Sequence, residues 1–75
     1  MQRMTRSDRR TPSITQLGEL LTPPQVAQRL GVRLVTLADW RFRGRGPRWV
    51  RVGRLVRYPS ALLEAWLAER LHGAA

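Results

Sequence analysis

Apolar residues recur along this chain with two different periods, and turn-forming residues separate the resulting blocks. Spacings of three and four residues occur over 23–30, 34–43 and 60–72 and are typical of amphipathic helices. Alternation of apolar and polar residues over 49–52 and 55–58 is typical of half-buried strands. The pattern therefore predicts a mostly α fold that contains one small β-hairpin.

The first helix has clear boundary signals. Thr22 is placed as the N-cap, and Gln25 three residues later completes a capping box. Pro23 suits the first helical position, where its missing N–H is not needed. Gly31 is expected to end the helix in the left-handed conformation and to turn the chain into the second helix, roughly Leu34–Arg43.

The second helix has two distinct faces. Leu34, Leu37 and Trp40 share one face and are expected to pack against the first helix. The opposite face carries Val35, Ala38, Asp39 and Phe42. For Phe42 we favour completion of the core over contact with thymine methyl groups. Two short helices joined through a turn that contains glycine are typical of a helix-turn-helix, and the hairpin that follows makes the predicted fold a winged helix-turn-helix.

The hairpin and the third helix complete the predicted fold. Gly53-Arg54 separates the two alternating runs and suits a type II′ turn. Ser60 is placed as the N-cap of the third helix, and Gly73 is expected to end it. The predicted buried stripe of this helix consists of Leu62, Leu63, Trp66, Leu67 and Leu71. We interpret the stripe as structural, with a dimer contact as the alternative.

The predicted domain occupies residues 19–72. Residues 1–18 lack periodicity, are rich in polar residues and carry four arginines, which indicates a flexible basic tail. We favour a solvated tail over an arm that contacts DNA. Residues 73–75 form a short C-terminal tail.

The charge of the chain favours an anionic partner. The net charge is +9 over 75 residues, and all 14 basic residues are arginine. Residues 32–58 hold eight arginines and one acid, Asp39. Nucleic acid is the expected partner, with an acidic membrane surface a distant second.

The composition disfavours several other functions. The absence of cysteine and the single histidine argue against a metal site, and we expect no cofactor and no small-molecule ligand. No nucleophile and base are grouped, so we expect no enzyme. No apolar run reaches the roughly 20 residues that span a bilayer, and no signal peptide is recognisable. These features predict a cytoplasmic protein without a membrane partner, and the expected nucleic-acid partner places it at the nucleoid.

Thirteen residues are candidates for contact with DNA. They are Arg33, Val35, Thr36, Ala38, Asp39, Arg41, Arg43, Arg45, Arg48, Arg51, Gly53, Arg54 and Arg57. Arg54 is the strongest candidate, because a residue at a hairpin tip projects furthest from the body. Val35 and Ala38 are placed to touch thymine methyl groups. For Asp39 we favour a salt bridge to Arg43 over a contact with cytosine.

Some of these candidates have a structural alternative. Arg33 and Thr36 would then be ordinary surface residues. Among the aromatic residues, we place Trp40 and Trp66 in the core and not in stacks with bases.

The ordered part of the sequence resembles the excisionase-type DNA-binding domains of the MerR-like winged-helix group. The matching positions include Leu20-Leu21-Thr22, Leu30-Gly31-Val32, Gly46-Pro47, Val56-Arg57-Tyr58 and Ala65-Trp66-Leu67. The resemblance implies a second helix in the major groove and a wing along the backbone or minor groove. The family usually has Ser at the position of Arg33, where it caps the second helix. In this chain the cap of that helix must therefore come from another group.

The resemblance also implies a biological role. Many members are phage or prophage excisionases, which bind attachment-site double-stranded DNA, bend it and direct a site-specific integrase toward excision. We expect a monomer that associates side by side with further copies on DNA in this role. A small phage transcriptional regulator is the first alternative, and the neighbouring genes would distinguish the two. A packaging or assembly adaptor, with its basic face against an acidic protein, is an alternative from another class.

Overall fold

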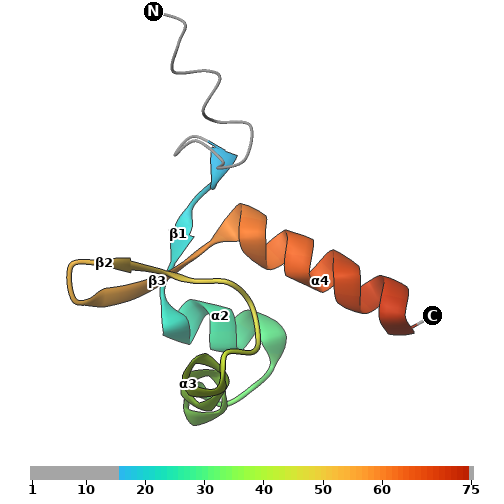
Figure 1. Cartoon of the computed structure of the whole chain (residues 1–75), viewed down its shortest axis with the longest axis horizontal. Helices are drawn as coiled ribbons and strands as arrows, with labels where there is room; N and C mark the ends of the chain where they lie inside the picture. Colours follow the sequence, from blue (N-terminus) through green and yellow to red (C-terminus); the bar gives the residue numbers. More distant parts are fainter. Residues whose placement is uncertain (1–15, 75) are drawn as a thin grey trace, which may run out of the picture.

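The computed structural model describes residues 16–74, and Figure 1 shows how the elements in this range are arranged. Within it, three helices surround a small antiparallel sheet of three strands. The order is β1 (Leu20–Leu21), α2 (Pro23–Leu30), α3 (Leu34–Arg43), β2 (Val50–Val52), β3 (Leu55–Pro59) and α4 (Ser60–Ala74). This arrangement confirms the predicted winged helix-turn-helix.

Helix α2 begins and ends at the predicted residues. The Gln25 backbone N–H donates to the Thr22 hydroxyl at 3.3 Å, and the Thr22 N–H donates to Gln25 Oε1 at 2.9 Å. This reciprocal pair satisfies two backbone donors at the helix start. Gly31 has a φ of 70°, and its N–H bonds back to the last turn. The capping box and the glycine stop are confirmed.

Helix α3 occupies the predicted range but lacks a side-chain cap at its start. Arg33 is the N-cap residue and makes no capping hydrogen bond through its side chain. Its carbonyl accepts from the N–H groups of Thr36 and Leu37, at 3.0 and 3.1 Å. Leu37 is fully buried and Trp40 is half-buried, as predicted. Leu34 is exposed instead, because it lies one turn before Leu37 at the edge of the buried face.

The hairpin has the predicted two-residue loop, and Val52 pairs with Leu55 across it. Gly53 has a φ of 66°, while no described non-glycine residue has a positive φ. A positive φ at the first loop residue, without one at Arg54, fits a type II′ turn and excludes type I′.

The sequence pattern missed the strand β1. Leu20 pairs with Pro59 and Leu21 pairs with Tyr58, so β3 is the central strand of the sheet. A two-residue strand is too short for alternation to reveal it, because that signal needs about four residues.

Two residues just before β1 accept hydrogen bonds from the start of α4. The Ser60 N–H donates to the Glu19 carbonyl at 2.8 Å, and the Ala61 N–H donates to the Leu17 carbonyl at 3.0 Å. Two donors of the first turn of α4 are thereby satisfied from outside the helix. Ser60, predicted to be the N-cap, is instead the first helical residue, and its hydroxyl accepts from the Glu19 N–H. Residues 1–15 of the predicted tail lie outside the described residues.

The core lies where α2, α3, β3 and the first half of α4 meet. Its buried members are Leu21, Val26, Ala27, Leu37, Tyr58 and Leu63. Trp40, Trp49 and Trp66 pack against this cluster and are half-buried. The assignment of Trp40 and Trp66 to the core is therefore confirmed.

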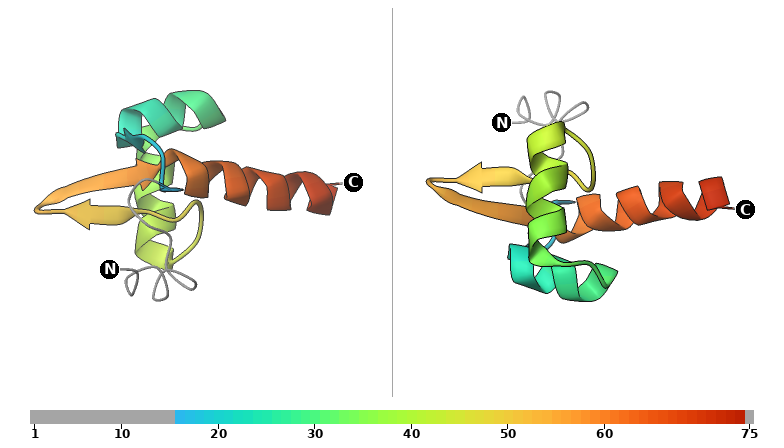
Figure 2. Two further views of the ribbon diagram at one scale, coloured as in Figure 1. Left: turned by 90° about the horizontal axis from the view of Figure 1, so that it is seen from above. Right: turned by 90° about the horizontal axis from the view of Figure 1, so that it is seen from below.

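The predicted stripe on α4 is buried over its first part alone. Leu63 is buried and Leu62 is half-buried, but Leu67 and Leu71 are exposed, Leu71 to 73%. At about 1.5 Å per residue, this helix extends well beyond the small body, as Figures 1 and 2 show. It continues to Ala74 and does not end at Gly73.

Gly46 is under a stronger constraint than Gly44. Both have a positive φ, but a Cβ on Gly46 would lie 2.8 Å from Trp40 Cε3, whereas one on Gly44 would meet nothing within 4 Å. Alanine at Gly44 should cost about 1 kcal/mol for backbone strain. Alanine at Gly46 should cost about 3 kcal/mol, because Trp40 must also move. Urea unfolding followed by circular dichroism measures the free energy of unfolding of both variants. Equal losses of stability in the two variants would show that Trp40 does not restrict position 46.

Candidate nucleic-acid interface

Helix α3 is the second helix of the α2–α3 pair and lies on the surface. Leu37 anchors it to the core, and Trp40 packs against the same cluster. Viewed from below, α3 lies in front of the sheet, with the hairpin and α4 extending to opposite sides of it (Figure 2). The face of α3 opposite Leu37 is therefore open to a partner.

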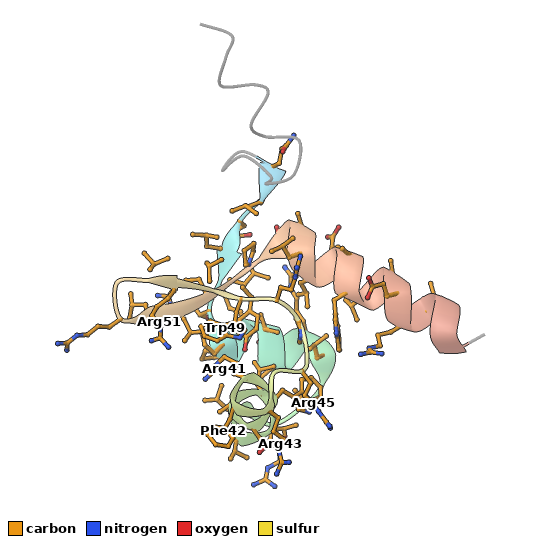
Figure 3. The ribbon with its side chains drawn as sticks, viewed as in Figure 1. Arg41, Phe42, Arg43, Arg45, Trp49 and Arg51 are labelled. Atoms are coloured by element: carbon orange, nitrogen blue, oxygen red, sulfur yellow. The ribbon has the colours of Figure 1, made fainter. Side chains whose placement is uncertain are left out.

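The open face of α3 is largely apolar. Val35 is 61% exposed and Phe42 is 88% exposed, and Ala38 between them is exposed as well. The prediction that Phe42 completes the core is wrong. Phe42 lies seven residues after Val35 and so shares its outward face, while Trp40 and Trp49 pack against the core instead. Figure 3 shows Phe42 at the outer side of α3.

Asp39 and Arg43 form the predicted salt bridge on this helix. Arg43 Nε lies 3.0 Å from Asp39 Oδ1 and 3.1 Å from Oδ2, so it donates to both carboxylate oxygens. Both side chains are more than half exposed, and such pairs contribute little to stability. The pairing neutralises the one acid on the outward face.

Arg41 is held by a contact that sequence reasoning missed. Its Nη1 donates to the Tyr58 hydroxyl at 2.8 Å, across 17 positions of sequence. Tyr58 is fully buried, and a buried hydroxyl without a hydrogen-bond partner would be destabilising, so Arg41 supplies that partner. The same bond holds the half-buried Arg41 on the side of α3 that faces the sheet. A guanidinium has five N–H donors, so further donors remain for an anion. No sequence signal links two residues so far apart.

The hairpin presents two of its three predicted arginines to solvent. Arg51 and Arg54 are exposed, and the Arg51 guanidinium lies 5.5 Å from the centre of the Trp49 ring. Arg57 is half-buried and donates to the Val56 carbonyl at 2.7 Å. Arg54 and Gly53 form the tip of the wing, with both residues exposed.

The loop between α3 and β2 adds two exposed arginines, Arg45 and Arg48. A shallow depression on this loop is lined by Gly44, Arg45, Gly46, Pro47, Arg48 and Trp49. At the other end of α3, Arg33 is exposed and Thr36 is half-buried. Cations thus lie at both ends of α3, on the loop and on the wing, and the centre of its outward face is apolar.

Comparison with protein families matches residues 20–71 to the family described as "Helix-turn-helix domain". The chain belongs to this helix-turn-helix family. Its members are DNA-binding and typically non-enzymatic. Comparisons with curated proteins and with solved structures give no significant match.

In a helix-turn-helix domain the second helix of the pair lies in the major groove of duplex DNA and the first crosses the backbone. Here the second helix is α3. Within residues 16–74, no helix is long and apolar enough to cross a membrane.

The Arg41–Tyr58 hydrogen bond can be measured by a double-mutant cycle. Tyr58→Phe, Arg41→Met and the double variant remove the acceptor, the donor and both. The coupling energy in urea unfolding should be about 2 kcal/mol, as for a partly buried hydrogen bond to a charged group. A coupling near zero would show that the contact does not stabilise the fold.

Proposed function

We propose that this protein is an architectural factor that binds double-stranded DNA in a sequence-dependent manner. Helix α3 enters the major groove, and the hairpin from Val50 to Pro59 acts as a wing along the adjacent backbone. Arg33, Thr36, Arg45, Arg48, Arg51 and Arg54 contact phosphates, while Val35, Ala38 and Phe42 meet base edges.

The observation that carries this proposal is the distribution of exposed arginines. They lie at the ends of α3, on the loop that follows it and on the wing. The centre of the outward face of α3 has none. Phosphate contacts fix the position of a protein on a duplex but carry no direct sequence information. This distribution suits a protein that clamps the backbone and responds to DNA shape more than one that reads many bases through hydrogen bonds.

The finer role that we propose is that of a phage or prophage excisionase. It would bind near an attachment site, associate side by side with further copies on neighbouring sites, and direct a site-specific integrase in the bacterial cytoplasm. The support is the resemblance of the matched positions from Leu20 to Leu71 to excisionase-type domains, together with the backbone-clamping surface. An integrase gene beside this one would favour this role, and an autoregulated promoter without one would favour a transcriptional regulator.

Arg54→Ala tests the role of the wing, and Arg70→Ala is a matched control that removes the same charge. Arg70 lies on α4 with its guanidinium 4.8 Å from the centre of the Trp66 ring, remote from the wing. For the wild type, the affinity for a random-sequence duplex should fall steeply with salt, by about 0.9 log units per log unit of salt for each phosphate neutralised. Arg54→Ala should reduce that slope by about 0.9 and weaken binding to all sequences alike.

The Arg70→Ala slope should equal that of the wild type. A wild-type affinity that does not change with salt, or the absence of binding to any duplex at low salt, would contradict DNA binding and favour an adaptor for an acidic protein. Equal reductions of slope in both variants would show that the wing is not the contacting element.

A further inference from the structure

Three exposed residues form one continuous apolar stripe on the outward face of α3: Val35, Ala38 and Phe42. Their spacing of three and then four residues places them in a row on one side of the helix. Phe42 ends the row with 88% of its surface exposed. We refer to these three residues as the α3 stripe.

The α3 stripe contributes little to the stability of the chain itself. A phenylalanine gives its large apolar area to a fold only when that area is removed from water. The buried side of α3 is already filled by Leu37, with Trp40 packed beside it. Within residues 16–74 nothing buries Phe42, so its apolar area is available to a binding partner.

The surroundings of the stripe define the chemistry of that molecule. Arg43 and Arg45 lie one and three residues after Phe42, Arg33 precedes the helix, and all three are exposed. The one acid on this face, Asp39, is paired with Arg43. The partner must therefore be apolar at the centre of the contact and anionic at its rim.

Duplex DNA meets both requirements. Phosphates supply the anionic rim, and the major groove presents one apolar group on its base edges, the methyl group at C5 of thymine. Cytosine methylated at C5 presents the same group. The pairing of Asp39 with Arg43 also leaves few hydrogen-bonding groups on this face to read other base edges.

We propose that the α3 stripe recognises C5-methyl groups of pyrimidines in the major groove, with Phe42 as its main specificity-determining residue. This inference rests on the proposed DNA-binding function and names the base chemistry that the function selects. The target sites are accordingly rich in thymine at the positions beneath α3.

The test removes the methyl group without changing base pairing. Duplexes that bind the wild-type protein are selected from a random-sequence pool. The strongest is then synthesised with thymine and with deoxyuridine at the same positions. Wild-type affinity should fall about fourfold for each contacted methyl group removed, the factor expected for one buried methyl or methylene group. The Phe42→Ala variant should bind the thymine duplex as weakly as the wild type binds the deoxyuridine duplex, with no comparable further loss on deoxyuridine.

Leu71→Ala is the matched control, because Leu71 is a large apolar residue that is 73% exposed on α4, outside the proposed interface. It should retain the wild-type ratio of affinities for thymine and deoxyuridine. Both variants change exposed side chains, so their thermal unfolding should match that of the wild type, which separates loss of contact from loss of fold.

A second arm distinguishes the two sources of the methyl group. At the contacted positions, thymine is replaced by cytosine or by 5-methylcytosine, each paired with guanine. Tighter binding to the methylated form would assign recognition to the methyl group in either base. Equal binding, together with a preference for thymine over deoxyuridine, would assign it to thymine.

Two results would overturn the inference while leaving DNA binding intact. One is equal wild-type affinity for the thymine and deoxyuridine duplexes. The other is the same thymine preference in Phe42→Ala as in the wild type. Failure to select any duplex from the pool would instead overturn the proposed function itself.

Discussion

The fold depends on the burial of β3 at the centre of the molecule. This strand pairs with β1 on one side and β2 on the other, and it contacts both α2 and α4. Tyr58 in this strand is 1% exposed, pairs with Leu21 and has its hydroxyl bonded to Arg41. Because a chain this small has one core, the same buried side chains that close the sheet also fix the helix pair and the wing.

This shared core explains the shape of the candidate interface. Leu37 holds α3 through one face, so the opposite face must project from the body. Strand β3 is itself one strand of the wing. The loop that joins the end of α3 to the wing is held where Gly46 packs closely against Trp40. The interface helix and the wing are therefore positioned by contacts that lie on their buried sides, which leaves the outward residues free to serve binding.

Local sequence signals predicted the parts of the structure that neighbouring residues determine. The capping box at Thr22, the α3 range and the two-residue hairpin loop depend on residues close in the chain. Contacts between residues that are distant in the sequence cannot be predicted from such local signals. The features missed for this reason are β1, the hydrogen bonds of residues 17–19 to α4, and the Arg41–Tyr58 bond. Phe42 was misplaced for a related reason, since periodicity places it on the outward face, but the apolar character of phenylalanine favoured the core.

The central claim is that the outward face of α3 and the wing tip meet duplex DNA together. Titration of ¹⁵N-labelled protein with a short duplex, followed by amide chemical shifts, tests it residue by residue. The largest changes are expected at Val35, Ala38 and Phe42 and at the tip residues Gly53 and Arg54, with small changes along α4 from Glu64 to Leu71. Changes concentrated on α4, with α3 and the wing unaffected, would contradict it.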